Sequence, residues 1–127
     1  MSGNLHHISL TCRDLLASQL FYQLFGFVAD KKYEDETVII LLLKDEDVFI
    51  ELFHFKRLIQ RAAQAKNLQN IGFTHLAFKS RCLSATRHLL EQKGYLCQED
   101  RIARVSNFRY FFTADPDGNL VEIVEEQ

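Results

Sequence analysis

Apolar and polar residues alternate along the chain in short runs that predict strands and helices in a fixed order. Residues 5–11 alternate and hold few helix-forming residues, which indicates a strand. Residues 15–25 follow Asp14, a suitable helix N-cap, and precede Gly26, a suitable C-terminal stop, so they predict a helix. The apolar stripe of this helix consists of Leu16, Leu20 and Leu24. Three further strands are expected at 27–33, 37–43 and 48–53.

The second half of the chain repeats this order. An alternating segment at 72–79 predicts a strand, residues 81–93 predict a helix, and Gly94 is the expected stop of that helix. Strands are expected at 95–99, 108–113 and 119–125. The last two are separated by Asp115-Pro116-Asp117-Gly118, a strong turn sequence because proline presets φ and glycine accepts a positive φ.

Fixed spacings relate the two halves to each other. His7 in HHISL aligns with His75 in THLAF at an offset of 75 − 7 = 68, and the two helix-stopping glycines share that offset. Glu51 in FIEL aligns with Glu122 in LVEI at an offset of 122 − 51 = 71. Self-similarity of this kind is the signature of a structural repeat. Each half therefore reads as strand, helix and three strands, with a central glutamate in the last strand.

The repeat and the chain length together predict one α+β domain over residues 1–127. A chain of 127 residues has the size of one domain and can bury a sizeable core. The expected βαβββ modules cover 5–54 and 71–126, and a linker at 55–70 with a short helix joins them. The basic residues of the linker are Lys56, Arg57, Arg61 and Lys66. Since the linker has no acidic residue, this segment is either a solvated basic surface or a cationic rim for an anionic substrate.

Composition and charge favour a small molecule as the partner. The formal net charge of −2 gives no indication of binding to nucleic acid or to a membrane surface. No apolar run approaches the roughly 20 residues that a membrane helix needs. The cysteines, Cys12, Cys82 and Cys97, form no CxxC pair, and the first residues lack the layout of a secretory signal. We therefore expect a cytoplasmic protein with free thiols.

Two histidines and two glutamates carry the candidate chemistry. Because residues two apart in a strand share a face, His7 and His75 both lie among small neighbours, away from the apolar residues expected under the helices. A carboxylate placed mid-strand among apolar residues, as Glu51 and Glu122 are, is costly unless it is paired, solvated or bound to a metal. Two imidazoles and two carboxylates suit one divalent ion such as Ni, Zn, Fe or Mn. The alternative is a pair of satisfied core histidines with two glutamates facing solvent.

Neighbouring histidines compete for the ligand role. His6 is adjacent to His7, but strand alternation and the match of Ile8-Ser9-Leu10 to Leu76-Ala77-Phe78 favour His7. His6 aligns with Thr74 and is expected at a strand end or on the helix-packed side. His54 has no repeat partner and is a weaker candidate for the rim of a pocket.

These motifs resemble the vicinal oxygen chelate superfamily. Its members include glyoxalase I, extradiol dioxygenases, fosfomycin-resistance thiol transferases, methylmalonyl-CoA epimerase and bleomycin-binding proteins. The resemblance covers nearly the whole chain, and the segments that carry it are HHISL, LFGF at 24–27, FIELF at 49–53, THLAF and DPDGNLVEI at 115–123. The chain is most similar to small bacterial lactoylglutathione lyase-like proteins. The resemblance implies paired βαβββ modules that form a cupped, incompletely closed mixed sheet around a metal, and a homodimer.

The resemblance also implies roles for individual residues. The glyoxalase I ligand order His–Glu–His–Glu falls on His7, Glu51, His75 and Glu122, which would hold one divalent ion. A glutamate that loosens from the ion acts as the base in such chemistry, so the candidates for this role are Glu122 and Glu51. The expected substrate pocket is lined by Phe49, Phe53, Thr11, Phe55 and Tyr110.

Two positions depart from bacterial glyoxalase I. An Arg and an Asn there help to hold glutathione, and this chain has Thr11 and Phe55 in their places. We expect a divalent-metal-dependent lyase or isomerase of the glyoxalase I type, acting on a small chelating α-hydroxycarbonyl or hemithioacetal. One alternative is a metal-dependent dioxygenase that recruits Tyr110 or His54 near the substrate. Another is a non-catalytic protein that binds a drug or antibiotic, although the complete ligand set favours an enzyme.

Overall fold

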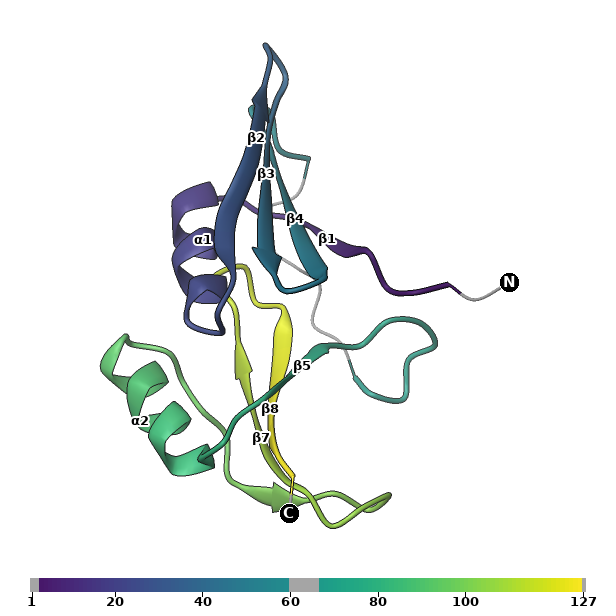
Figure 1. Cartoon of the computed structure of the whole chain (residues 1–127), viewed down its shortest axis with the longest axis vertical. Coiled ribbons are helices and arrows are strands. Elements are labelled where there is room, and N and C mark those ends of the chain that lie inside the picture. The colour runs from purple at the N-terminus through teal and green to yellow at the C-terminus, as the bar shows by residue number, and fades with distance from the viewer. Residues whose placement is uncertain (1–2, 60–66, 127) are drawn as a thin grey trace. The chain divides into compact units, whose positions relative to one another are not determined.

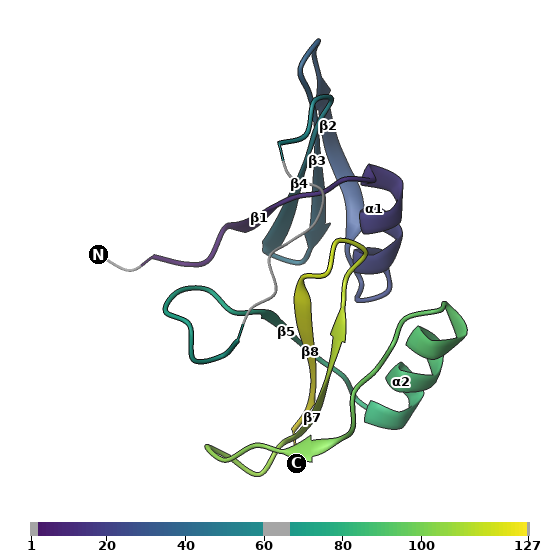
Figure 2. The same cartoon turned by 180° about the vertical axis from the view of Figure 1, so that it is seen from behind.

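The chain divides into two compact units, Met1–Ala62 and Ala63–Gln127. A computed structural model describes residues 3–59 and 67–126. Each unit contains one βαβββ module, so the α+β fold expected from the repeat is confirmed. In both views a helix lies beside the sheet of its own unit (Figure 1 and Figure 2).

The first unit is a four-stranded mixed sheet with one helix. Its elements are β1 (His7–Thr11), α1 (Leu15–Gln23), β2 (Val28–Glu34), β3 (Val38–Asp45) and β4 (Val48–Phe55). The strand order is β1-β4-β3-β2, with β1 parallel to β4 and the other pairs antiparallel. A parallel pair needs a long crossover connection, and α1 with the β2–β3 hairpin supplies it.

Local signals set the ends of α1, whereas tertiary packing decides which of its faces is buried. The Asp14 carboxylate accepts a hydrogen bond from the Ala17 N–H at 3.1 Å, and Gly26 takes a φ of 98° after the helix. The expected leucine stripe is not the buried face, because Leu16 and Leu20 are 61% and 53% exposed. The buried residues are Ser18, Phe21 and Tyr22. Two large rings bury more apolar area than two leucines do, and the small serine allows a close approach.

Strand alternation gives the first sheet two distinct faces. Leu43 of β3 lies opposite Ile50 of β4, and Leu41 lies opposite Leu52. All four are buried on the face that packs against α1. The other face, here called the glutamate face, holds Glu51.

The second unit repeats the same topology. Its elements are β5 (Leu76–Lys79), α2 (Leu83–Gln92), β6 (Arg101–Ile102), β7 (Arg109–Ala114) and β8 (Leu120–Glu125). The strand order is β5-β8-β7-β6, and β5 is parallel to β8. The core residues, all nearly or fully buried, are Leu83, Leu90, Phe111, Val121 and Ile123. Glu122, between two of these positions in β8, lies on the opposite face, which is the glutamate face of this sheet.

The prediction of a strand at 95–99 is wrong, and side chains explain why. The Gln98 N–H donates to the Phe112 carbonyl at 2.8 Å, as a strand would, but the ladder stops there. The Thr113 hydroxyl donates a hydrogen bond to the Leu96 carbonyl at 2.7 Å, and the Arg87 guanidinium donates one to the Gln98 carbonyl. These side-chain bonds replace a regular ladder, and β6 begins only at Arg101.

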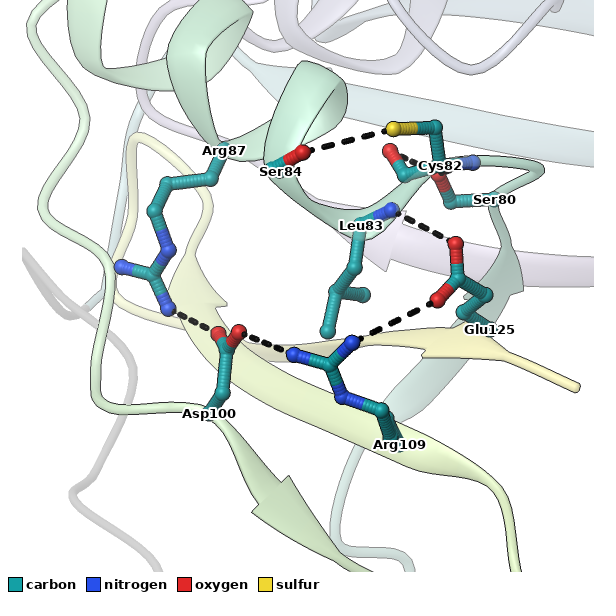
Figure 3. A network of polar contacts seen from close by, with 8 residues as sticks. All are labelled: Ser80, Cys82, Leu83, Ser84, Arg87, Asp100, Arg109 and Glu125. Carbon is teal, nitrogen blue, oxygen red and sulfur yellow. Dashed lines mark hydrogen bonds and ion pairs between the residues drawn. The ribbon is translucent and has the colours of Figure 1, made fainter.

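A charged network fixes this segment to α2 and β7 (Figure 3). Asp100 accepts from Arg87 of α2 and from Arg109 of β7. Glu125 of β8 lies 3.9 Å from Arg109 and also accepts from the Leu83 N–H at 3.1 Å. A carboxylate at a helix N-terminus is favourable, and Glu125 thus caps α2 from a neighbouring strand.

A short helix was expected within the linker at 55–70, but residues 55–59 and 67–70 contain none, and residues 60–66 lie outside the described residues. Lys56, directly after β4, pairs with Glu34 at 3.0 Å and donates to the Asp35 carbonyl at 2.7 Å. This lysine therefore closes the end of the β2–β3 hairpin. Arg61 and Lys66 are among the residues that the structure does not describe.

Within the described ranges no helix has the length and apolar character needed to cross a membrane.

Asp35 organises the turn between β2 and β3. One carboxylate oxygen accepts from the Thr37 N–H, the Thr37 hydroxyl and the Val38 N–H at 2.8, 2.9 and 3.0 Å. The other accepts from the Tyr33 hydroxyl at 3.0 Å. These hydrogen bonds, led by those from Thr37, lower the pKa of Asp35 from 3.8 to about 2.

This depressed pKa predicts an acid-dependent loss of stability. The carboxylate stabilises the fold above its unfolded pKa of 3.8, and that contribution is lost as the pH falls from there to about 2. Asp35→Ala is expected to lower the free energy of unfolding at pH 7 and to flatten its decline across this window. Urea denaturation at pH 7, 4 and 2.5 measures both effects. Asp30→Ala, at an exposed aspartate of β2, is the matched control, and an equal effect of both substitutions would contradict the role of Asp35.

Candidate metal-binding residues

The first candidate pair lies where β1 runs beside β4. His7 pairs with Phe49 and Ser9 pairs with Glu51, so His7 and Glu51 are diagonal neighbours on the glutamate face. The His7 Nε2 and the Glu51 Oε1 are 3.6 Å apart, with 42% and 26% of the two side chains exposed. The Ser9 hydroxyl donates to the same Glu51 oxygen at 2.8 Å.

The second pair is closer and better shielded. His75 directly precedes β5, and Glu122 of β8 lies opposite Ala77 of β5. The His75 Nε2 and the Glu122 Oε1 are 2.9 Å apart, and 20% and 13% of these side chains are exposed. Phe112 of β7 lies opposite Glu122, and its ring meets the His75 ring edge to face at 4.9 Å.

The residue before each histidine contacts its other ring nitrogen. The His6 Nδ1 lies 2.8 Å from the His7 Nδ1, and the Thr74 hydroxyl lies 2.8 Å from the His75 Nδ1. Of two Nδ1 atoms in contact only one carries the hydrogen, so one of these two histidines donates to the other. With Nδ1 engaged in this way, the Nε2 of each candidate ligand is the atom directed at its glutamate. Metal-bound histidines have this arrangement, because a partner on one nitrogen orients the other.

The separations within each pair fit two ligands of one ion. Nitrogen and oxygen ligands lie about 2.0–2.2 Å from such ions, and ligands at ordinary coordination angles are then roughly 3–3.5 Å apart. The observed 2.9 and 3.6 Å are near this range. Within residues 3–59 and 67–126, no group of three or more His, Cys, Asp or Glu side chains converges in the structure. The structure therefore brings His7 to Glu51 and His75 to Glu122, one pair in each unit.

Aromatic residues flank Glu51 on its own face. Phe49 and Phe53 precede and follow it by two residues, and Phe55 stacks on Phe53 with ring centroids 5.9 Å apart. Thr11 at the end of β1 pairs with Phe53. These predicted pocket residues thus share the glutamate face of the first sheet.

Tyr110 occupies a similar place in the second unit. It lies two residues before Phe112 in β7, so it shares the glutamate face, and the two rings are 5.7 Å apart. His54 differs from its expected position on a pocket rim. It pairs with Ile39, on the face packed against α1, and its Nδ1 lies 3.3 Å from the Cys12 carbonyl. Alternation along β4 places position 54 opposite to position 51, which explains the error.

Sequence reasoning missed three residues around the pairs. Ser9 was noted only as a small neighbour, His6 only as a competitor of His7, and Phe112 not at all. The offset of 68 that aligns His6 with Thr74 was a usable signal, because it places a polar residue before each histidine. Phe112 needed the register between β7 and β8, which the sequence alone does not specify.

Comparison with known proteins gives one family and one common fold. Residues 4–123 match the profile of the "Glyoxalase/Bleomycin resistance protein/Dioxygenase superfamily". YaeR of Escherichia coli (strain K12), an uncharacterized protein, is 29% identical over an alignment of 126 residues, and the match covers 95% of this chain and 95% of that protein. A glyoxalase family protein from Enterococcus faecalis is 24% identical, with a TM-score of 0.80 over 96% of this chain and 97% of that one. The trypanothione-dependent glyoxalase I of Leishmania major is 16% identical, with a TM-score of 0.76 over 98% of this chain and 88% of that one.

Proposed function

This chain belongs to the glyoxalase/bleomycin resistance protein/dioxygenase superfamily, and on that basis we propose that it is a divalent-metal-dependent lyase or isomerase of the glyoxalase I type. The observation that carries the proposal is the repeated pair. A histidine nitrogen and a glutamate oxygen approach each other on the glutamate face of each sheet, at repeat-equivalent positions. In the proposal both pairs, His7 with Glu51 and His75 with Glu122, bind one divalent ion such as Ni, Zn, Fe or Mn.

The proposed substrate is a small α-hydroxycarbonyl or hemithioacetal with two adjacent oxygens. A bound divalent ion supplies stabilisation of the negative charge that develops on such oxygens when a C–H proton leaves. Glu122 or Glu51 accepts that proton and returns it to the neighbouring carbon. Phe49 and Phe53 beside Glu51 give an apolar wall that favours a substrate with an apolar group and limits access of water.

A substrate screen on protein of known metal content tests this proposal. The protein is loaded with nickel, zinc, iron or manganese and assayed with adducts of methylglyoxal and several thiols, while dissolved oxygen is recorded. Isomerised product without oxygen uptake supports the proposal. Glu51→Gln and Glu122→Gln are each expected to abolish formation of this product. Product formation coupled to oxygen uptake would instead favour the dioxygenase alternative, for which Tyr110 lies on the face of Glu122. Tight binding without turnover of any substrate would favour a non-catalytic binding protein.

We also propose that the protein is a homodimer. β2 is an edge strand whose seven residues are all exposed, and exposed edges offer unpaired N–H and C=O groups to a second chain. Two chains of 14.8 kDa give 2 × 14.8 = 29.6 kDa. Light scattering at micromolar concentration is expected to report a particle of about that mass. A particle with the mass of one chain would contradict the dimer.

A further inference from the structure

We propose that Ser9 is a positioning residue whose hydroxyl fixes the carboxylate of Glu51 on the glutamate face of the first sheet. Its consequence for metal binding rests on the function proposed above. Ser9 and Glu51 are directly paired in the parallel ladder of β1 and β4, so their side chains leave neighbouring strands at the same level. The Ser9 Oγ donates to the Glu51 Oε1 at 2.8 Å, the ordinary length of a hydroxyl hydrogen bond.

The histidine of this unit does not hold Glu51 by itself. The 3.6 Å between the His7 Nε2 and the Glu51 Oε1 is too long for a hydrogen bond. Both side chains are also more exposed than their counterparts in the second unit, at 42% and 26% against 20% and 13%. A partly exposed glutamate has several rotamers open to it, so a fixed donor is needed to keep one of them populated.

The second unit shows what replaces this serine. Ala77 is the residue opposite Glu122, and it has no hydroxyl to donate. There the His75 Nε2 reaches Glu122 directly at 2.9 Å, and the Phe112 ring packs edge-on against His75. The two carboxylates are therefore held by different means, Glu122 by its histidine and Glu51 by Ser9.

The hydrogen bond uses one lone pair of the Glu51 Oε1 and leaves another lone pair of this oxygen, and the Oε2, available as ligands of a cation. A hydroxyl that donates to a carboxylate forms a charge-assisted bond, which is shorter and stronger than a neutral one. Outer partners of this kind typically change metal affinity by about 10–100-fold. Ser9 is thus expected to act on metal binding through Glu51 rather than by contact with the ion.

Two measurements distinguish the role of Ser9 from the proposed metal function: the mobility of the Glu51 side chain and the Kd for Zn²⁺. In metal-free protein, NMR relaxation of the Glu51 side-chain carbons reports its mobility, with Glu122 as the internal reference. Ser9→Ala is expected to increase the mobility of Glu51 and to leave Glu122 unchanged, and Ser9→Thr is expected to restore Glu51. Titration with Zn²⁺ alone is expected to give a Kd raised about 10–100-fold in Ser9→Ala and close to wild type in Ser9→Thr. Ser84→Ala, at an exposed serine of α2, is the matched control.

The possible results are distinguishable. Unchanged mobility of Glu51 in Ser9→Ala, or failure of Ser9→Thr to restore it, would overturn the role of Ser9. A wild-type protein that binds no Zn²⁺ but shows the mobility change would retain the role of Ser9 and contradict the proposed metal function. A wild-type protein that binds Zn²⁺ with the same Kd as Ser9→Ala would retain the metal function and overturn this inference.

Discussion

Replacing His7 or His75 with alanine is expected to weaken divalent-ion binding by more than roughly 100-fold. Each substitution removes a nitrogen ligand, which costs more than the ~10–100-fold that follows loss of an outer partner. It also leaves the glutamate of the same unit without the imidazole 3.6 or 2.9 Å away. Competition with a chromophoric chelator measures the affinity.

His6→Ala tests the assignment of the ligand within the adjacent histidines. His6 contacts His7 through Nδ1 and precedes β1, so its loss is expected to cost at most about 10–100-fold. His88→Ala, at an exposed histidine of α2, is the control for loss of a histidine outside the two pairs. If His6→Ala strips the ion and His7→Ala retains it, the assignment of His7 is wrong.

Activity with the methylglyoxal–glutathione adduct is expected to be weak or absent. Thr11 and Phe55 stand where bacterial glyoxalase I, which this chain resembles, has an Arg and an Asn that hold the glutathione arm, so the guanidinium and the amide of those two residues are missing here. Each such contact contributes ~1.5–3 kcal/mol, so the loss of two lowers kcat/KM by about 100-fold or more. Lys56 does not readily replace them, because its ammonium group already binds Glu34 and the Asp35 carbonyl.

Steady-state kinetics on nickel-, zinc- and manganese-loaded protein measure this effect. The double substitution Thr11→Arg with Phe55→Asn is expected to raise kcat/KM for the glutathione adduct. Thr11→Gln with Phe55→Leu, which changes size without adding the charge or the amide, is the matched control. A wild-type kcat/KM near the ~10⁶ M⁻¹s⁻¹ of efficient enzymes would show that other groups hold glutathione.

Local and periodic signals in the sequence were sufficient for the architecture. The common offset of the histidines and glycines predicted the two modules. Alternation along the strands distinguished the glutamate faces from the helix-packed faces. Asp14 acts through a hydrogen bond three residues away and Gly26 through its own φ, so their roles at the start and the end of α1 were predictable. Such features depend on residues that are close together in the sequence, so the sequence alone predicts them.

Features that depend on distant contacts were not predictable in this way. The segment after Gly94 is irregular because Thr113 and Arg87 bind its carbonyl groups, and neither contact follows from the local pattern. The bond from Ser9 to Glu51 depends on the register of β1 and β4, which are 42 residues apart at that point. The sequence thus placed the candidate ligands on faces but did not identify the residues that orient them.

The central claim is that one divalent ion binds per chain and needs both pairs. Elemental analysis combined with equilibrium titration of the full chain measures it most directly. One ion per chain is expected for the wild type, and none for either double substitution, His7→Ala with Glu51→Ala or His75→Ala with Glu122→Ala. No ion in the wild type, two ions per chain, or one ion retained after removal of either pair would contradict the account.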